Sequence, residues 1–211
     1  MVNLSKAGKM PCRSWSLQAG STCPGSIDPK TKQPVAVCAG CYAKIGNYAF
    51  ANVKNTREQN RLDWVKPDWV DRMVAELDND RYFRWFDSGD IYHPKLAEKI
   101  YEIMKKTPWC KHWLPTKSYK IPKIKVWLTK MKRLQNVTVR YSADSIMGKY
   151  DRHHGSTVIP SIDYATNAYI CKSSLNDGKC GSCRACWDKS IPTIAYVAHG
   201  VVLKSKLKNV A

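Results

Sequence analysis

The sequence predicts an α/β fold, a partial (β/α) barrel of about six mainly parallel strands with cysteine-rich loops at the C-terminal rim of the sheet. Short apolar or aromatic runs alternate with amphipathic segments, which is the pattern of βα units. The chain has 211 residues and 44% hydrophobic content, enough for one domain with its own core. Polar residues and cysteines follow the predicted strands. We therefore expect a single domain over residues 1–211 that includes cysteine-rich segments 12–41 and 171–187.

The first half of the chain predicts two strands and three helices. Residues 34–37 are predicted to form a strand that leads directly into Cys38, and a helix is expected over 47–64. Residues 68–77 place apolar side chains on one face of a second helix. The aromatic run 82–86 favours a strand, because aromatic residues are enriched in sheets. Pro94 then begins a helix with apolar residues at helical spacing.

The second half continues the alternation. A strand is predicted over 111–116, a helix over 122–134 and a strand over 137–141, and up to three further strands are expected over 157–162, 169–170 and 193–197. Residues 151–156 are expected to form a loop, and residues 204–211 to fray. Strands joined by helices run parallel with right-handed crossovers, so functional groups gather where the strands end.

Several polar residues are expected at that C-terminal rim. They are candidates for binding a polar ligand or cofactor: Asp87, Ser88, Gly89 and Asp90 after one strand, Lys117 and Ser118 after the next, and Asp144 after the 137–141 strand. The competing interpretation is structural, since Asp-Ser-Gly-Asp is ordinary turn chemistry and Asp144 is a suitable helix cap.

Seven of the nine cysteines form two groups with metal-ligand spacing, Cys23, Cys38 and Cys41 near the start and Cys171, Cys180, Cys183 and Cys186 near the end. The C-x2-C-x2-C run at 180–186 resembles the ligand run of bacterial ferredoxins, with Cys171 as the fourth ligand. Zinc is the alternative, because paired C-x2-C knuckles such as Cys38/Cys41 also make structural zinc sites. We expect one or two [4Fe–4S] clusters.

The N-terminal group has only three cysteines, which leaves a fourth coordination position unfilled. An open iron binds a further ligand. If Cys12 or a C-terminal cysteine fills the position, the centre is instead suited to electron transfer or to a structural role.

The formal charge is +18, and residues 103–143 contain no acidic side chain. Lysines and arginines in this span are interleaved with tryptophan and tyrosine. The span is suited to an anionic partner, nucleic acid or an acidic host protein; the alternative is a solvated lysine face on core-packed helices. A structural-metal module that engages such a partner without catalysis is thus the second functional hypothesis.

The sequence contains no signal-like segment and no apolar run near the roughly 20 residues that span a bilayer. No membrane association is expected. Clustered cysteines in a reducing compartment are more often ligands than disulfides, and an odd total of nine fits full pairing poorly.

Five motifs together resemble the phage gene product 88 family. They are Trp15-Ser-Leu-Gln-Ala-Gly-Ser-Thr-Cys-Pro-Gly25, Cys38-Ala-Gly-Cys-Tyr-Ala43, Asp87-Ser-Gly-Asp-Ile-Tyr92, Thr116-Lys-Ser118 and Cys180-Gly-Ser-Cys-Arg-Ala-Cys-Trp187. The resemblance implies a bacteriophage origin and action in the cytoplasm of a bacterial host.

A more distant resemblance is to radical S-adenosylmethionine enzymes, which hold a three-cysteine [4Fe–4S] cluster after the first strand of a partial barrel. Cys38 and Cys41 match that position, and Asp87–Asp90 lies where those enzymes have a glycine-rich motif that holds the cofactor. Two features differ: Cys23 lies far ahead of Cys38, and the glycine-rich motif matches loosely. The resemblance implies S-adenosylmethionine as a cofactor and redox or radical chemistry.

Overall fold

The computed structural model describes residues 2–6 and 8–199 and contains one open sheet of seven strands. The strands are β1 (Arg13–Trp15), β2 (Tyr82–Trp85), β3 (Lys111–Thr116), β4 (Val137–Ile146), β5 (Gly155–Ile159), β6 (Tyr169–Ile170) and β7 (Thr193–Val197). All neighbouring pairs are parallel, in the order β1-β2-β3-β4-β5-β7-β6. The predicted α/β fold, a partial barrel that does not close, is confirmed. The expected 204–211 tail lies outside the described residues.

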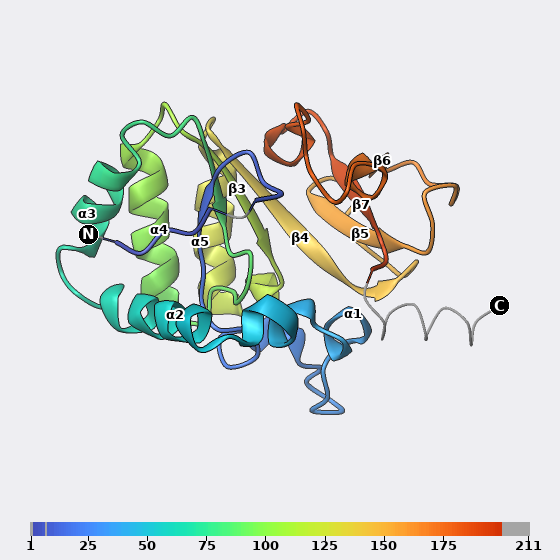
Figure 1. Ribbon diagram of the computed structural model, residues 1–211, viewed down its shortest axis with the longest axis horizontal. Coiled ribbons are helices and arrows are strands. Elements are labelled where there is room, and N and C mark those ends of the chain that lie inside the picture. Colours follow the sequence, from blue (N-terminus) through green and yellow to red (C-terminus); the bar gives the residue numbers. More distant parts are fainter. Residues whose placement is uncertain (1, 7, 200–211) are drawn as a thin grey trace.

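One face of the sheet is covered by three helices, α3 (Trp69–Glu76), α4 (Pro94–Lys106) and α5 (Pro122–Arg133), which pack side by side (Figure 1). Every second residue of β2 to β4 points into this layer. The main core contains Phe83, Trp85, Leu114, Val137 and Val139 from the strands. Opposite them lie the apolar stripes of the helices, which include Leu96, Ile100, Ile103, Ile124, Leu128 and Met131. Helical periodicity in the sequence therefore located this core correctly.

The helix α2 (Ala51–Asp63) lies across the end of the sheet where β1 and β2 finish (Figure 1). Its buried residue Asn60 donates from Nδ2 to the Ser16 carbonyl oxygen at 3.0 Å, just after β1. Its neighbour Arg57 donates from Nε to Ser88 Oγ at 2.5 Å, just after β2. A polar helix face thus closes the C-terminal rim of the first two strands.

The first strand differs from the sequence prediction. Residues 34–37 do not form a strand: α1 (Ala36–Ala39) begins there, and the first strand is β1, far earlier in the chain. Pro34 has no N–H for a ladder and makes only an isolated bridge with Ile27. Trp15, fully buried against Trp69 and Trp85, holds the three-residue β1 in place. Tertiary packing of one large side chain thus outweighs the weak local signal.

The opposite face of the sheet is covered by loops, with a small second core of Cys12, Trp113 and Trp187. The Trp187 ring packs edge-on against Tyr82 and Trp113 from β2 and β3. The segment that holds the C-terminal cysteines therefore lies on the sheet face away from the helices.

Candidate metal centre

The three N-terminal cysteines lie at the C-terminal rim, as predicted, although Cys23 follows β1 instead of preceding the first strand. The Asp90 N–H donates to the Thr22 carbonyl oxygen at 3.0 Å, and Lys120 Nζ donates to the Gly25 carbonyl oxygen at 2.9 Å. Gly25 approaches the Lys117 carbonyl so closely that a Cβ would collide with it. These contacts hold the Cys23 loop against the ends of β2 and β3.

Cys38 lies in α1, which packs against β4, and Cys41 follows that helix. Burial raises the pKa of Cys23 to about 12, and the neighbouring Asp90, Cys41 and Cys38 act in the same direction. Burial also raises the pKa of Cys38, which nearby Lys117 partly offsets. The three thiols are thus neighbours, and burial favours the protonated form of Cys23 and Cys38. Binding of a metal would release those protons.

The C-terminal cysteines lie against the loop-covered face. Cys171 follows β6 and donates its N–H to Ala195 of β7 at 2.8 Å, while the Cys180 N–H donates to the Lys9 carbonyl oxygen at 3.1 Å. The Cys186 Sγ lies 3.3 Å from Tyr196 Oη, and the Cys183 Sγ lies 3.7 Å from Tyr169 Oη. Strands β6 and β7 thereby position Cys171 beside the Cys180–Cys186 loop.

The thiols of this second group influence one another. Burial raises the pKa of Cys180, and the neighbouring Cys171 and Cys183 thiols act in the same direction. Burial raises the pKa of Cys186 to about 11, which the hydrogen bond with Tyr196 partly offsets, and Cys171 adds to the increase. All four cysteines that the spacing assigned to one site are therefore close in space.

Cys12 belongs with this second group. It is 7% exposed and packs in the small core beside Cys186, and burial raises its pKa to about 12 with Cys180 among the nearby groups. The N-terminal group therefore keeps three cysteines, and Cys12 is an additional thiol near the C-terminal four.

Two arginines of the sheet, Arg84 and Arg140, lie near the C-terminal cysteines. The Arg84 guanidinium lies 4.7 Å from the Trp113 ring centre, and its buried Nε has no hydrogen-bond partner. Arg84 lowers the pKa of Cys12, Cys180 and Cys186, whose main shift is upward through burial. Arg140, 1% exposed, donates to the Ala185, Cys186 and Asp188 carbonyl oxygens. From the sequence, Arg140 was noted only as part of the basic span 103–143 and Arg84 was not singled out, although both residues alternate with core residues of β2 and β4.

Within residues 2–6 and 8–199, no three His, Cys, Asp or Glu side chains converge in a geometry that could hold a metal ion. The cysteines are neighbours without being arranged as ligands. Their chemistry nevertheless fits an iron–sulfur cluster or zinc, because both are bound by soft thiolates. Positive groups next to each set of thiols offset the negative charge that a thiolate-bound cluster carries. The donor set therefore suits such a group.

Three of the predicted polar rim residues, Asp90, Lys117 and Asp144, lie near the N-terminal cysteines. Asp87 accepts a hydrogen bond from Ser16 Oγ and its carbonyl oxygen accepts one from Tyr42 Oη at 2.7 Å. Ser88 Oγ donates to the Leu17 carbonyl oxygen at 2.7 Å, and Gly89 has a φ of +74° that favours glycine. These residues fasten the β2 turn to the segment after β1.

Asp90 links the ends of β2 and β3. Its carboxylate accepts from Thr116 Oγ1 at 2.7 Å and from the Lys117 N–H at 2.8 Å. Burial raises its pKa, which those hydrogen bonds partly offset. Ser118 Oγ donates to the Ile91 carbonyl oxygen at 2.6 Å. Asp90 and Ser118 thus make hydrogen bonds that join the turn after β2 to the end of β3.

Lys117 and Asp144 lie together at the rim. The buried Lys117 ammonium donates to the Ser142 carbonyl oxygen at 3.2 Å and lies 3.6 Å from Asp144 Oδ1. Burial lowers the pKa of Lys117, and the nearby Cys38 and Asp144 oppose that change. Asp144 also pairs with Lys120 at 2.6 Å, and its side chain is 42% exposed. An ion-paired, partly accessible carboxylate therefore lies next to the N-terminal cysteines.

Among the residues that the structure describes, no helix has the length and apolarity needed to cross a bilayer. The fold and the site define the class of protein: an open, all-parallel α/β sheet that carries two separate groups of cysteines, one at its rim and one on its face.

The chain belongs to the gene product 88 family, a family of phage proteins, because the model of that family matches residues 1–189. The match includes all seven cysteines of the two groups and ends before β7. No curated protein and no solved structure matches the chain.

Proposed function

We propose that this phage protein binds iron–sulfur clusters, with Cys171, Cys180, Cys183 and Cys186 as the ligands of one [4Fe–4S] cluster. The observation that carries the proposal is the position of Cys171, which two neighbouring strands bring beside the C-x2-C-x2-C loop. A cluster at these cysteines would supply one-electron transfer. Arg84 and Arg140 beside it would favour the reduced, more negative form.

The N-terminal group would hold a second cluster with one open iron. Three neighbouring cysteines without a fourth support this part of the proposal. Lys117 and Asp144, with the Asp87–Asp90 turn, are proposed as contacts for a ligand of that iron. S-adenosylmethionine is the specific ligand proposed for redox or radical chemistry, and action in the host cytoplasm completes the proposal, since thiols stay reduced there.

The test is a metal inventory of anaerobically purified protein: iron and acid-labile sulfide per chain, with an electron paramagnetic resonance spectrum after reduction. Cys183→Ser should remove the iron of the C-terminal group, and Cys38→Ser that of the N-terminal group. Cys110→Ala is the matched control, because Cys110 is fully buried in the main core among apolar residues. A colourless protein that contains zinc but neither iron nor sulfide would contradict the proposal in favour of a structural zinc site.

Radical chemistry has a separate test. The reduced, cluster-loaded protein is incubated with S-adenosylmethionine, and binding and reductive cleavage are followed by chromatography. Absence of both, in protein whose iron and sulfide content is complete, would leave an electron-transfer or structural role.

A second candidate function is binding of an anionic partner, nucleic acid or an acidic host protein, through α5. This helix has no acidic residue, and Lys123, Lys125 and Arg133 are exposed without an ion pair among the described residues. Lys120 is less suitable because it already pairs with Asp144. Trp127 of α5 is partly buried, so the attraction between this helix and an anionic partner would be mainly electrostatic.

The affinity of such a complex should fall steeply as salt rises, because phosphate binding releases counterions. Lys123→Glu with Lys125→Glu should weaken binding of duplex DNA or single-stranded RNA. Lys30→Glu serves as the charge-matched control for one reversal, at an exposed position away from α5. Equal affinity in the control and the α5 variant would exclude this surface.

A further inference from the structure

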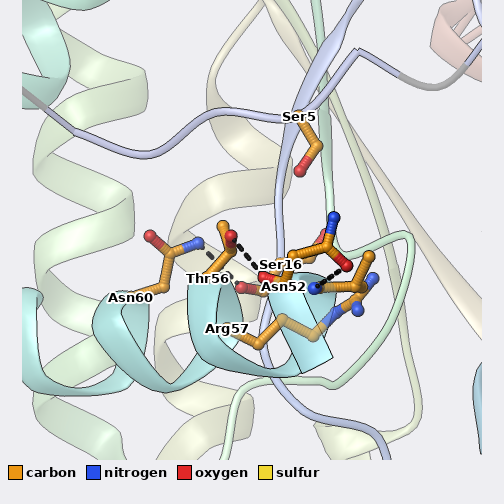
Figure 2. Close-up of a pocket in the computed structure, with 7 residues that line it drawn as sticks. Ser5, Ser16, Asn52, Thr56, Arg57 and Asn60 are labelled. Atoms are coloured by element: carbon orange, nitrogen blue, oxygen red, sulfur yellow. Dashed lines mark hydrogen bonds between the residues drawn. The ribbon is translucent and has the colours of Figure 1, made fainter. Parts of the chain in front are cut away.

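A small polar cavity lies between α2 and the segments around Ser5 and Ser16, and none of the polar rim residues predicted from the sequence is among its lining residues. Its volume is about 100 Å³, and its polar lining residues are Ser5, Ser16, Asn52, Thr56, Arg57 and Asn60. Figure 2 shows Thr56, Arg57 and Asn60 projecting from α2, with Ser5 opposite them on the N-terminal segment. None of the residues that line the cavity is acidic.

Arg57 is the residue that makes this cavity unusual. It is 5% exposed, and its Nη1 has no hydrogen-bond partner. Its Nε donates to Ser88 Oγ at 2.5 Å, and its guanidinium carbon Cζ lies 4.8 Å from the centre of the Tyr48 ring. A buried donor without a partner costs about 1–3 kcal/mol, and more when it is charged. Such a donor suits a hydrogen-bond acceptor in the cavity.

The nearby Asp87 forms an ion pair with this arginine but gives its Nη1 no hydrogen bond. Its Oδ1 lies 3.8 Å from Arg57 Nη2, beyond hydrogen-bond distance, and it already accepts from Ser16 Oγ. Its Oδ2 accepts from Tyr48 Oη at 3.4 Å. The carboxylate is therefore engaged by hydroxyl groups, and Nη1 remains available.

The start of α2 provides a second feature that favours an anion. The helix has 13 residues and begins at Ala51, so Asn52 and Val53, which line the cavity, belong to its first turn. Backbone N–H groups in a first turn carry partial positive charge because they lack backbone acceptors within the helix. The Val53 N–H already donates to Asn52 Oδ1 at 2.9 Å, so the helix end contributes mainly through its dipole. A buried guanidinium and a helix N-terminus thus border the same cavity.

We propose that this cavity binds a small oxyanion, a carboxylate or phosphate group, which accepts a hydrogen bond from Arg57 Nη1. Guanidinium groups bind both kinds of oxyanion through charge-assisted hydrogen bonds. The volume is equivalent to about three water molecules at roughly 30 Å³ each, so the cavity fits one such group and not a whole nucleotide. The overall charge of +18 attracts the ligand to the protein.

Occupancy would also affect the rim. Arg57 contacts Ser88, and the adjacent Asp87 carbonyl accepts from Tyr42, which follows Cys41 directly. An anion on Nη1 fixes the guanidinium that supports this turn. The site is independent of iron–sulfur binding, so the two proposals fail separately.

The test is calorimetric titration of the full chain with inorganic phosphate and, separately, with acetate, at constant ionic strength in chloride. Saturable binding of either anion with one site per chain is expected. Arg57→Lys keeps the charge but loses the fork geometry and should weaken binding at least tenfold.

Because Arg57 also supports the fold, a second variant tests the cavity without altering that residue. Ser5→Asp adds a negative charge at a half-buried wall position and should abolish binding of both anions. Asn55→Asp, at an exposed α2 position outside the cavity lining, adds the same charge and should bind like the wild type. Saturation by only one anion supports the site and identifies the oxyanion. No saturable binding of either anion, or an unchanged affinity in Ser5→Asp, would overturn the proposal.

Discussion

Replacement of Arg140 by methionine should loosen the C-terminal cysteine loop from the sheet. The guanidinium of this β4 residue donates to five carbonyl oxygens: Ala185 at 3.0 Å, Cys186 at 3.2 Å, Asp188 at 2.9 Å, Ile191 at 2.9 Å and Pro192 at 3.3 Å. Methionine has a similar length but no donor. Arg140→Met therefore keeps much of the packing while removing every one of these hydrogen bonds.

The expected loss follows from those distances. Hydrogen bonds from a charged donor contribute about 1.5–3 kcal/mol each, and the contacts to Ala185, Asp188 and Ile191 are the well-formed ones. Removal of the charge also removes its burial penalty, which offsets part of the loss. The free energy of unfolding should fall by about 3–5 kcal/mol, less than the roughly 4.5–9 kcal/mol of three such hydrogen bonds because of that offset.

The assay is urea unfolding of metal-free, reduced protein, followed by tryptophan fluorescence. Arg133→Met is the matched control, since Arg133 is exposed on α5, and its free energy of unfolding should change by less than about 0.5 kcal/mol. A change below about 1 kcal/mol in Arg140→Met would refute the view that this arginine holds the loop. The cluster proposal further expects Arg140→Met to retain less iron at the C-terminal group.

Three other changes have clear expectations. Gly25→Ala should lower the free energy of unfolding in urea by about 1–3 kcal/mol and reduce iron at the N-terminal group, because the new Cβ meets the Lys117 carbonyl. Gly8→Ala is the control and should be neutral, since no atom lies within 4 Å of its Cβ. Equal effects of the two variants would contradict the packing argument. Leu128→Ala in the main core should cost about 2–5 kcal/mol, whereas Val126→Ala, at a side chain that is 57% exposed, should cost little; similar losses would mean that α5 does not cover the sheet. His112 is fully buried, and burial lowers its pKa from 6.5 to about 3. Between those two pH values the imidazole is protonated in the unfolded chain and neutral in the folded chain. Its contribution to stability is complete above pH 6.5 and falls by about 1.4 kcal/mol per pH unit as pH decreases toward 3. His112→Gln should flatten that slope in urea unfolding at pH 4.5 and 6.5, and an unchanged slope would assign it to other groups.

Most of the fold could be predicted from the sequence because long amphipathic helices and aromatic or β-branched strands have strong local patterns. The strands at 111–116 and 193–197 have the predicted bounds, and the helix predicted at 122–134 is α5. The strand β1 could not be found in this way, since three residues show no period and one buried tryptophan decides their position. The strand predicted over residues 34–37 was wrong for the opposite reason, because Val-Ala-Val has strand propensity but no neighbouring strand to pair with.

The two groups of cysteines were predictable from spacing alone, but their surroundings were not. Both groups were expected to reach one rim: Cys171 lies at the carboxyl end of β6, whereas the Cys180–Cys186 loop packs against a face of the sheet. The order of side chains along β2 and β4 contained a signal for the loop-covered face. Arg84 and Arg140 alternate with the apolar core residues, so they lie on the opposite face of the sheet. A charged residue at such a position indicates that polar loops, and not an apolar helix layer, cover that face. The Arg57 cavity had no local signal, because its walls come from segments that only the fold brings together.

The position of β7 between β5 and β6 determines the order in which the two cysteine groups can assemble during synthesis. The chain leaves the ribosome from its N-terminus, so β6 has no neighbouring strand until residues 193–197 have been made. The N-terminal group needs only β1 to β4 and can form its contacts while the rest is still being translated. Cys171 must wait for Ala195. The C-terminal group would therefore be organised after the N-terminal group, and a nascent chain stalled before β7 would contain one organised cysteine group instead of two.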